Sequence, residues 1–450
     1  MSQRIAHAVV IGASMAGLMA ARILSDYAER VTLIERDAPS QEEIAARKGV
    51  PQSWHPHVLL SKGEALLGQW FPGLAQELIA QGARRANFPG DCLWMQEGVY
   101  KLRSDTGLHL LMMSRPLLEG VTRQRVLQLP GVTFAAGCEV RGLLCENSAD
   151  QQRICGVRFA ARDAAPGEEQ SVAADLVIDC SGRSAQTRHW LKALGLPEPQ
   201  VSEVTAKMAY TTRRYLDDGK ILRDSHAILC MPVPPLLKRS GVVLRQENGE
   251  IIVTMCGWLG EQAPRDEAGF LAYAQSLASP LIAQLLEQAT PCSEFYSHQI
   301  PSNQHRHYEK MRDLPRGLLA LGDAFFSFNP VYGQGMSAAA LQVEQLQRCL
   351  QEYGPAHADL APVFFKRAAK AMRAVWMMAV GEDFRFQETS GRKLPGTDLI
   401  NRYVSAVHRL NGKDETSLRA LCEVMTLMRP PSALFAPGIV ARVVRDKLGA

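Results

Sequence analysis

The order of hydrophobic and polar positions at the start of the chain predicts a strand, a turn and a helix. A short apolar run extends from His7 to Ile11, a helical stretch from Leu18 to Ser25, and a second strand from Val31 to Ile34. Small residues fill the turn between the first strand and the helix. Together these elements predict a βαβ unit of about 30 residues.

The rest of the chain alternates between short strands and helices. A helix is predicted from about Lys62 to Gln81, with a break at Pro72-Gly73. The short strands that follow, with a hairpin tip at Asp150 to Gln152, are Val99–Leu102, Leu108–Met113, Val132–Ala135, Val140–Leu144, Ile154–Ala160 and Leu176–Asp179. A second β-rich block is predicted from about Val204 to Trp258. The later elements are a helix near Asp266 to Gln288, a buried strand at Leu318 to Gly322, a helix from about Gly335 to Glu352, and a helical remainder from about Ala361.

Composition excludes several classes of protein. The chain has 450 residues, a length that predicts two or three domains or one large interleaved domain. Its residues are 46% apolar and 21% charged, close to the globular norm. Basic residues exceed acidic ones by 50 − 46 = 4, too few for an electrostatic nucleic-acid binder. None of the ten cysteines is paired as C-x-x-C, so we expect reduced thiols in a cytoplasmic protein and no metal site. The chain contains no run of about 20 uninterrupted apolar residues, so no membrane-spanning helix is predicted.

The first turn carries a dinucleotide-type fingerprint, Gly12-x-Ser14-x-x-Gly17. The first glycine permits the tight turn, the last permits close packing of helix on strand, and the helix N-terminus presents free N–H groups to a pyrophosphate. Ser14 replaces the middle glycine and is small enough to let the backbone approach the phosphates. Glu35 lies 18 residues past Gly17, at the end of the second strand, where a carboxylate can accept ribose hydroxyls.

Two further motifs follow predicted strands. Gly322-Asp323 ends one strand and is followed by a Gly-rich helix start at Gly333 to Met336. A strand-end aspartate can bind a ribityl hydroxyl, and such a helix start can place N–H donors under the electron-rich edge of a flavin. Asp179-Cys180-Ser181-Gly182 ends the other strand, at the edge where open α/β sheets bind ligands.

Together the motifs resemble the FAD-dependent monooxygenases of the para-hydroxybenzoate-hydroxylase fold. The chain looks most similar to the bacterial flavin-dependent epoxidases of polyether biosynthesis, in Arg47-Lys48-Gly49-Val50-Pro51-Gln52 with His55 and His57, in Ser114-Arg115-Pro116-Leu117-Leu118, and in Gly322-Asp323 through Asn329-Pro330-Val331-Tyr332-Gly333-Gln334-Gly335-Met336. The resemblance implies an α/β fold with a Rossmann-like, glutathione-reductase-type FAD-binding domain, an interleaved β-sheet substrate domain and C-terminal helices. The implied boundaries are 1–60, 110–195 and 300–355 for the FAD-binding domain, 61–109 and 196–299 for the substrate domain, and 356–450 for the helical region.

The resemblance also assigns cofactor-binding roles. Gly12, Ser14, Met15 and Gly17 would hold the pyrophosphate, Glu35 the adenosine ribose, and Arg36 would lie beside the adenine end. Arg47 and Arg115 would reach the phosphates or ribityl, and the Val140 backbone would meet adenine. Asp323 would bind the ribityl, while Pro330, Gly333, Gly335 and Met336 would line the isoalloxazine. Cys180 and Ser181 depart from the commonest family spelling, which puts an NADPH contact at that motif in doubt.

The β-rich block predicts an apolar substrate cavity. Its candidate lining residues are Met208, Tyr210, Met231, Val243, Met255 and Trp258, and the alternative is that most of them are simply core residues. His55 and His57 could position flavin or substrate, although hydrogen-bonded loop histidines are the favoured interpretation, and no third metal ligand accompanies them. Phe364 to Val380 is interpreted as a packed amphipathic helix, with a cap over the cavity or peripheral membrane contact as alternatives.

These features predict an FAD-dependent monooxygenase driven by NAD(P)H. A flavin C4a-hydroperoxide would transfer one oxygen from O₂ to an apolar small molecule, most simply an alkene in a natural-product pathway, or an aromatic ring. Epoxidation needs no protein base, which fits the absence of an obvious acid–base pair. The alternatives are a flavin-dependent reductase or desaturase of an isoprenoid, and a non-catalytic lipid-binding module. Halogenation is disfavoured because no two tryptophans lie two positions apart, as a W-x-W motif requires.

Overall fold

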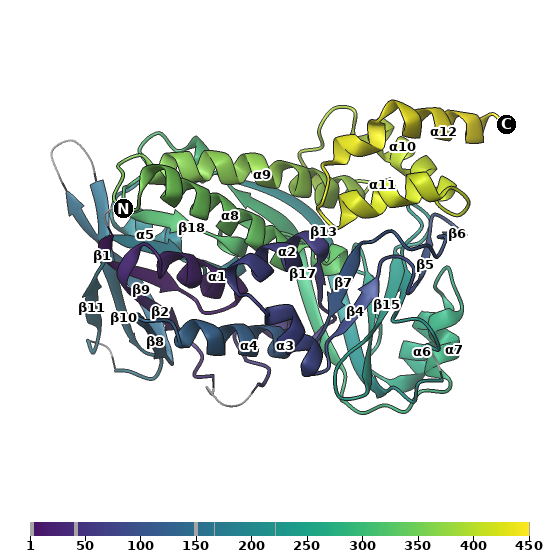
Figure 1. Cartoon of the computed structure of the whole chain (residues 1–450), viewed down its shortest axis with the longest axis horizontal. Helices are drawn as coiled ribbons and strands as arrows, with labels where there is room; N and C mark the ends of the chain where they lie inside the picture. The colour runs from purple at the N-terminus through teal and green to yellow at the C-terminus, as the bar shows by residue number, and fades with distance from the viewer. Residues whose placement is uncertain (1–3, 40–43, 148–151, 166, 221, 450) are drawn as a thin grey trace.

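A parallel sheet forms one end of the molecule (Figure 1). The computed structural model describes residues 4–39, 44–147, 152–165, 167–220 and 222–449. The strand order of this five-stranded sheet is β18 (Leu318–Ala320), β12 (Leu176–Asp179), β1 (Ile5–Ile11), β2 (Ala28–Glu35) and β8 (Val132–Ala136). Every neighbouring pair is parallel, so the carboxyl ends of the strands meet at one edge. The apolar runs that predicted these strands are buried, as expected for a sheet covered on both faces.

Helices from distant parts of the chain cover this sheet. They are α1 (Met15–Leu24), α4 (Arg115–Leu127), α8 (Gly335–Tyr353) and α9 (Leu360–Asp383). Figure 1 shows α8 and α9 side by side above the sheet, and their buried faces join the same core. The sequence pattern did not predict α4, which begins where the Ser114 hydroxyl accepts a hydrogen bond from the Leu117 amide.

A nine-stranded sheet forms the other end. Its path is β19 (Phe326–Ser327), β17 (Tyr296–Arg306), β13 (Val201–Leu216), β16 (Glu250–Gly257), β15 (Arg239–Arg245), β14 (Ala227–Cys230), β5 (Cys92–Gln96) and β6 (Val99–Tyr100), with β20 (Ser390–Gly391) paired to β13. Residues 92–100 thus join a sheet otherwise built from strands that begin at residue 201 or later. The predicted β-rich block from 204 to 258 is confirmed.

The two faces of this sheet contact different partners, because side chains alternate along each strand. Val243, Ile251, Val253 and Met255 pack on α6 (Glu267–Gln275) and α7 (Leu281–Leu286). The prediction of one helix over 266–288 is wrong, because Pro280 begins a second helix.

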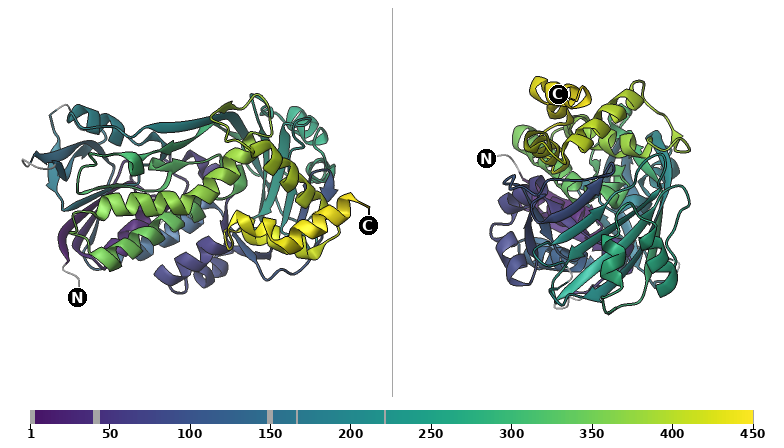
Figure 2. Two further views of the ribbon diagram at one scale, coloured as in Figure 1. Left: turned by 90° about the horizontal axis from the view of Figure 1, so that it is seen from above. Right: turned by 90° about the vertical axis from the view of Figure 1, so that its right-hand side faces the viewer.

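The opposite face of the large sheet contacts the C-terminal helices (Figure 2). These are α10 (Thr397–Leu410), α11 (Glu415–Met425) and α12 (Pro437–Lys447). Val407, Leu410 and Leu421 pack against Phe88 and Trp94 of the sheet region. The helical interpretation of the chain after residue 361 is confirmed.

Smaller elements complete the fold. They are the strands β3 (Val58–Leu60), β4 (Arg84–Asn87), β7 (His109–Met112), β9 (Cys138–Asn147), β10 (Gln152–Ala161) and β11 (Gln170–Ala173), and the helices α2 (Ser61–Trp70), α3 (Leu74–Ala80) and α5 (Thr187–Ala193). The break between α2 and α3 at Pro72-Gly73 is confirmed. β9 and β10 pair as an antiparallel hairpin, but Asp150 and Gln151 of its predicted tip lie outside the described residues. The predicted fold class, a Rossmann-like α/β region with a β-sheet domain and C-terminal helices, is confirmed.

Candidate functional site

A cavity of about 770 Å³ extends from the parallel sheet to the large sheet. Its polar end is formed where β1, β2, β12 and β18 finish, with Gly12, Glu35, Cys180 and Asp323 on the wall. Open parallel sheets bind ligands at this edge. Its apolar end is formed by side chains of the large sheet, including Trp94 and Leu244. A polar and an apolar half therefore share one continuous space.

The N-terminus of α1 opens onto the polar half. Gly12 has a φ of +93°, and a Cβ there would lie 2.8 Å from the Cys180 carbonyl oxygen. Gly17 does not reach the cavity wall; a Cβ on it would lie 1.9 Å from the Gly12 oxygen, so it permits the tight strand–helix packing. No side chain caps α1 and no acidic residue lies in its first turn. Its first amides are thus available to an anion.

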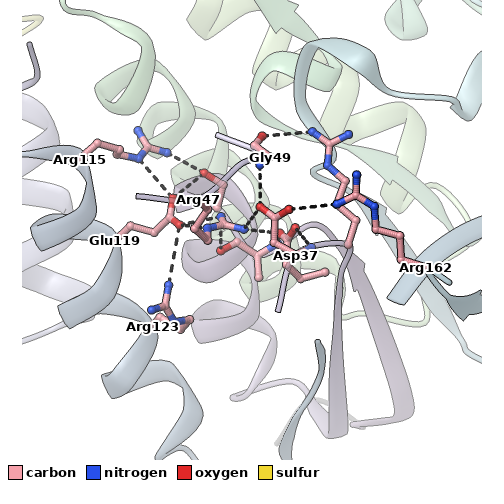
Figure 3. A network of polar contacts seen from close by, with 11 residues as sticks. Asp37, Arg47, Gly49, Arg115, Glu119, Arg123 and Arg162 are labelled. Carbon is pink, nitrogen blue, oxygen red and sulfur yellow. Dashed lines mark hydrogen bonds and ion pairs between the residues drawn. The ribbon is translucent and has the colours of Figure 1, made fainter. Parts of the chain in front are cut away.

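A buried ion-pair network supports this turn (Figure 3). Arg47 contacts three carboxylates, those of Glu119 at 2.6 Å, Glu35 at 3.2 Å and Asp37 at 3.3 Å. Glu119 also accepts a hydrogen bond from the Ser14 hydroxyl at 2.8 Å, and Ser14 accepts one from Arg115 at 2.7 Å. The network therefore orients Ser14, the residue at the middle position of the fingerprint.

Burial alone would raise the pKa of Glu119, but the charges of Arg115 and Arg47 outweigh it and hold that pKa below its ordinary value. Both oxygens of Glu35 already accept backbone N–H groups, from Ala13 at 2.8 Å and Asp37 at 3.0 Å. A carboxylate oxygen has a second lone pair, so a ribose hydroxyl can still be accepted. The predicted ribose role of Glu35 stays a prediction.

Arg47 and Arg115 also lie on the cavity wall, but they are engaged with carboxylates or with Ser14. Their predicted contacts with phosphate or ribityl remain predictions. Arg36 is bonded to the Gly49 carbonyl at 3.1 Å. The other predicted cofactor residues on the wall are Met15, Val140, Pro330, Gly333, Gly335 and Met336.

Asp323 presents a carboxylate to the cavity from the end of β18. Among the described residues, no amide or side chain donates a hydrogen bond to that carboxylate. Burial raises the pKa of Asp323, and the nearby charges of Arg183, Arg115 and Arg306 only partly oppose it. An acceptor held in this way, facing a cavity, is ready for a hydroxyl donor.

The N-terminus of α8 is the second helix start at the cavity. Gly333 has a φ of +63°, and the helix begins at Gly335 without a side-chain cap or an acidic residue in its first turn. Both glycines lie on the wall. Free amides and the positive end of the helix dipole therefore face the cavity here.

The middle motif has a structural role at Asp179. Its buried carboxylate accepts the Ser181 amide at 2.9 Å, the Ser181 hydroxyl at 2.6 Å and the Thr187 hydroxyl. It therefore holds the loop after β12 rather than a ligand. Arg183, on the cavity wall, donates hydrogen bonds to Ser327 and Ser302.

His55 and His57 lie on the cavity wall and are also hydrogen-bonded. His55 Nδ1 contacts the Thr212 hydroxyl at 2.6 Å, and His57 Nδ1 contacts the His55 carbonyl at 2.8 Å. Burial, aided by neighbouring His298, lowers the pKa of His55 to about 4. Burial, aided by Arg115, lowers that of His57 to about 3. Both imidazoles are therefore neutral at physiological pH.

Of the predicted substrate residues, Tyr210 and Met231 line the cavity. The prediction that Met208, Met255 and Trp258 do so is wrong. Met255 points to the other face of the sheet, into the core with α6 and α7, as does Val243. Met208 and Trp258 pack with Phe386 in a core cluster to which Tyr210 also belongs, and of these four only Tyr210 lies on the cavity wall. For Val243 and Met255 the reason is alternation along a strand, which sends neighbours to opposite faces, and the sequence did not show which face bordered the cavity.

Sequence reasoning missed other residues of the site. The apolar wall also includes Phe88, Trp94, Leu110, Met112, Leu229, Val242 and Leu244. These come from four strands and a loop, so no local motif joins them. Glu119 was missed because α4 was missed, although Ser114 followed by Pro116 is a helix-start signal.

The fold and site together define a flavoprotein of the para-hydroxybenzoate-hydroxylase fold. Residues 6–361 match the family model described as FAD binding domain, and the chain belongs to that family. Protein Rv3254 of Mycobacterium tuberculosis is 33% identical over 456 residues, which cover 98% of this chain and 94% of that protein.

Solved structures share the fold. The p-nitrophenol 4-monooxygenase PnpA of Pseudomonas putida aligns with a TM-score of 0.66 at 15% identity, covering 95% of this chain and 99% of that chain. The flavin-dependent brominase Bmp2 aligns with a TM-score of 0.68 at 12% identity, covering 98% of this chain and 100% of that chain.

None of the helices among the described residues combines the length and the apolar character that a membrane span requires.

The site fits FAD on its own geometry. Two uncapped helix starts face the same cavity, one for the pyrophosphate and one for the flavin edge. A Cβ on Gly12 would collide with the backbone of Cys180, directly after β12. The Asp323 carboxylate lines the same cavity and has no hydrogen-bond donor among the described residues. Gly12, Ser14 and Met15 would hold the pyrophosphate, Asp323 the ribityl chain, and Gly333 to Met336 the flavin.

Proposed function

We propose that this flavoprotein is a monooxygenase that transfers one oxygen atom of O₂ to an apolar small molecule, with NAD(P)H as a transient reductant. The supporting observation is that the FAD cradle and an apolar chamber are parts of one cavity. Bound FAD, once reduced, supplies the activation of O₂. The protein supplies binding, orientation and exclusion of water.

The chamber wall favours an apolar substrate. Trp94, Leu229, Met231 and Leu244 face the space, and each is buried or half-buried in the fold. Such a wall binds hydrocarbon surface and leaves few places for water, which would compete for activated oxygen. The Tyr210 hydroxyl on this wall already donates a hydrogen bond to the Asn329 side-chain oxygen.

We further propose epoxidation of an alkene in a natural-product pathway as the reaction that the chamber supports best. Hydroxylation of a phenol is assisted by a base that removes the phenolic proton. His55, with a pKa of about 4, is a poor proton acceptor at neutral pH, and burial holds the pKa of Tyr210 well above its usual range. An alkene needs no proton removed. The epoxidases of polyether biosynthesis stay the proposed nearest functional relatives.

The test is a product mass measured with purified protein, FAD, NADPH and candidate alkenes under ¹⁸O₂. A product heavier by one ¹⁸O atom, formed with matching O₂ uptake, supports the proposal. A product with two added hydrogens and no O₂ uptake would identify a reductase instead. Protein that neither retains nor rebinds FAD would support the non-catalytic binding module and exclude both enzymes.

A matched pair of variants locates the reaction in the chamber. Leu244→Trp enlarges a side chain on the cavity wall and so fills part of the apolar chamber. Val243→Leu changes the opposite face of the same strand. The first should abolish product while FAD content stays normal, and the second should leave turnover near wild type. Equal turnover in both would place the substrate elsewhere.

A further inference from the structure

A cluster of two histidines and a glutamate lies outside the cavity. His305 and His307 are separated by one residue at the end of β17, and Glu309 follows in the 3₁₀ turn Tyr308–Lys310. Side chains two positions apart on an extended strand share a face. Arg306 points the other way and donates to the backbone oxygens of Asp323 and Arg183, at the edge of the cavity. The histidines thus lie behind the strand, and neither lines the cavity.

The three side chains converge on one point. One ring nitrogen of His305, one of His307 and a Glu309 carboxylate oxygen all lie within 4.8 Å of one another. His307 Nδ1 is 2.7 Å from Glu309 Oε1, and His305 Nε2 is 3.4 Å from Glu309 Oε2. Ligands about 2.0 Å from a tetrahedral zinc ion are about 3.3 Å apart, so small side-chain rotations suffice to surround an ion.

Two atoms of the cluster are buried without a hydrogen-bond partner among the described residues, His305 Nε2 and Glu309 Oε2. His305 is only 9% exposed. Leaving such atoms unpaired is costly, and each unpaired group needs an explanation. A cation between them would use both lone pairs.

Neighbouring residues that are not ligands orient the imidazole rings of His305 and His307. His307 Nε2 lies 2.7 Å from the Ser202 hydroxyl on β13, which directs Nδ1 toward the cluster. The His305 ring stacks on Phe326, with centroids 3.8 Å apart and an interplanar angle of 17°. Trp376 of α9 also borders it. The cluster is therefore supported on one side by a hydroxyl and on the other by an apolar wall, as metal-ligating imidazoles commonly are.

We propose that His305, His307 and Glu309 bind one divalent transition-metal ion, with Zn²⁺ the best match. Two imidazoles and one carboxylate are a zinc ligand set, and water would take the fourth position. The ion would join the end of β17 to the following turn. It would thereby fix the strand segment whose Arg306 supports the Asp323 loop.

The test uses the FAD-loaded full chain with any affinity tag removed and bound metal stripped by a chelator. Titration with zinc sulfate in a calorimeter should show one ion per chain. Cobalt(II) should give the intense visible absorption of a four-coordinate site. His305→Gln and His307→Gln should each weaken zinc binding more than roughly 100-fold, beyond the effect of losing a supporting group. The exposed His189→Gln variant is the control and should bind as wild type.

Ser202→Ala gives a milder test that does not remove a ligand, with affinity falling roughly 10-fold. FAD content and circular dichroism check that each variant is folded. Two results would overturn the proposal: wild-type protein that binds no zinc at 100 times the protein concentration, or folded histidine variants that bind zinc as tightly as wild type.

Discussion

Asp179 and Asp323 finish or follow neighbouring strands of the parallel sheet but face different partners. The Asp179 carboxylate accepts three hydrogen bonds from its own loop and is fully buried. The Asp323 carboxylate faces the cavity and receives none from the described residues. Substituting each with alanine should therefore separate stability of the protein from affinity for FAD.

The expected magnitudes follow from these contacts. Asp323→Ala removes one hydrogen bond from a ribityl hydroxyl to a charged group, worth about 1.5–3 kcal/mol. The FAD dissociation constant should rise roughly 10- to 100-fold. The apoprotein should lose less than about 0.5 kcal/mol, and removal of a carboxylate whose pKa burial raises can even stabilise it. Asp179→Ala leaves the Ser181 amide and two hydroxyls unpaired, so the apoprotein should lose about 2–4 kcal/mol.

The assay needs two measurements on each variant. FAD affinity is measured by quenching of flavin fluorescence during titration of the apoprotein, and stability by urea unfolding of the same apoprotein. The reasoning is refuted if Asp323→Ala destabilises the apoprotein as much as Asp179→Ala does, or if its FAD affinity equals that of wild type. Asp323→Asn, which keeps one acceptor oxygen, should lie between wild type and Asp323→Ala in affinity.

Three further predictions follow from the site. Because the pKa of Glu119 is lower in the folded protein than its ordinary value of 4.5, its ion pairs stabilise fully above about pH 4.5 and are lost as pH falls through the folded pKa. Urea unfolding at pH 7 should show Glu119→Gln about 2–4 kcal/mol less stable, and the difference should shrink in acid; a pH-independent difference contradicts the charge argument. Gly17→Ala should prevent folding or shift α1, because its Cβ would lie 1.9 Å from the Gly12 oxygen. The control variant Gly438→Ala, at an exposed position, should fold normally. Normal FAD content in Gly17→Ala would contradict the packing argument. Because the pKa of His55 is about 4, kcat/KM for an alkene should not change between pH 6 and 8 through this residue, and a His55-dependent inflection near pH 7 would show that it acts as a base.

Local signals accounted for the cofactor half of the site. Gly12 follows β1, Glu35 ends β2 and Asp323 lies three residues past β18. Parallel strands bring their carboxyl ends to one edge, so sequence position implied proximity. The structure places all the predicted cofactor residues except Gly17 on the cavity wall. Gly17 lies beneath the wall because its function is packing.

The apolar half could not be inferred in the same way. Met255 and Thr254 are equally buried neighbours on β16, yet only Thr254 faces the cavity. A strand buried on both faces carries apolar residues at both parities, so the pattern does not reveal which face packs on α6 and α7 and which borders the cavity. Helix α4 was missed for a related reason, because its buried face contains charged residues of the ion-pair network.

The sequence by itself determined the βαβ start, the position of each cofactor motif at a strand end, and the order of the strand and helix blocks. These follow from interactions between residues close in the chain, such as turn conformation and hydrophobic periodicity. Only the tertiary structure decided which face of the large sheet forms the chamber and that Arg47 forms ion pairs with three carboxylates. It also decided that His305, His307 and Glu309 cluster at the end of β17, where His307 contacts Ser202. Those features depend on contacts between segments far apart in the chain, and no local pattern records them.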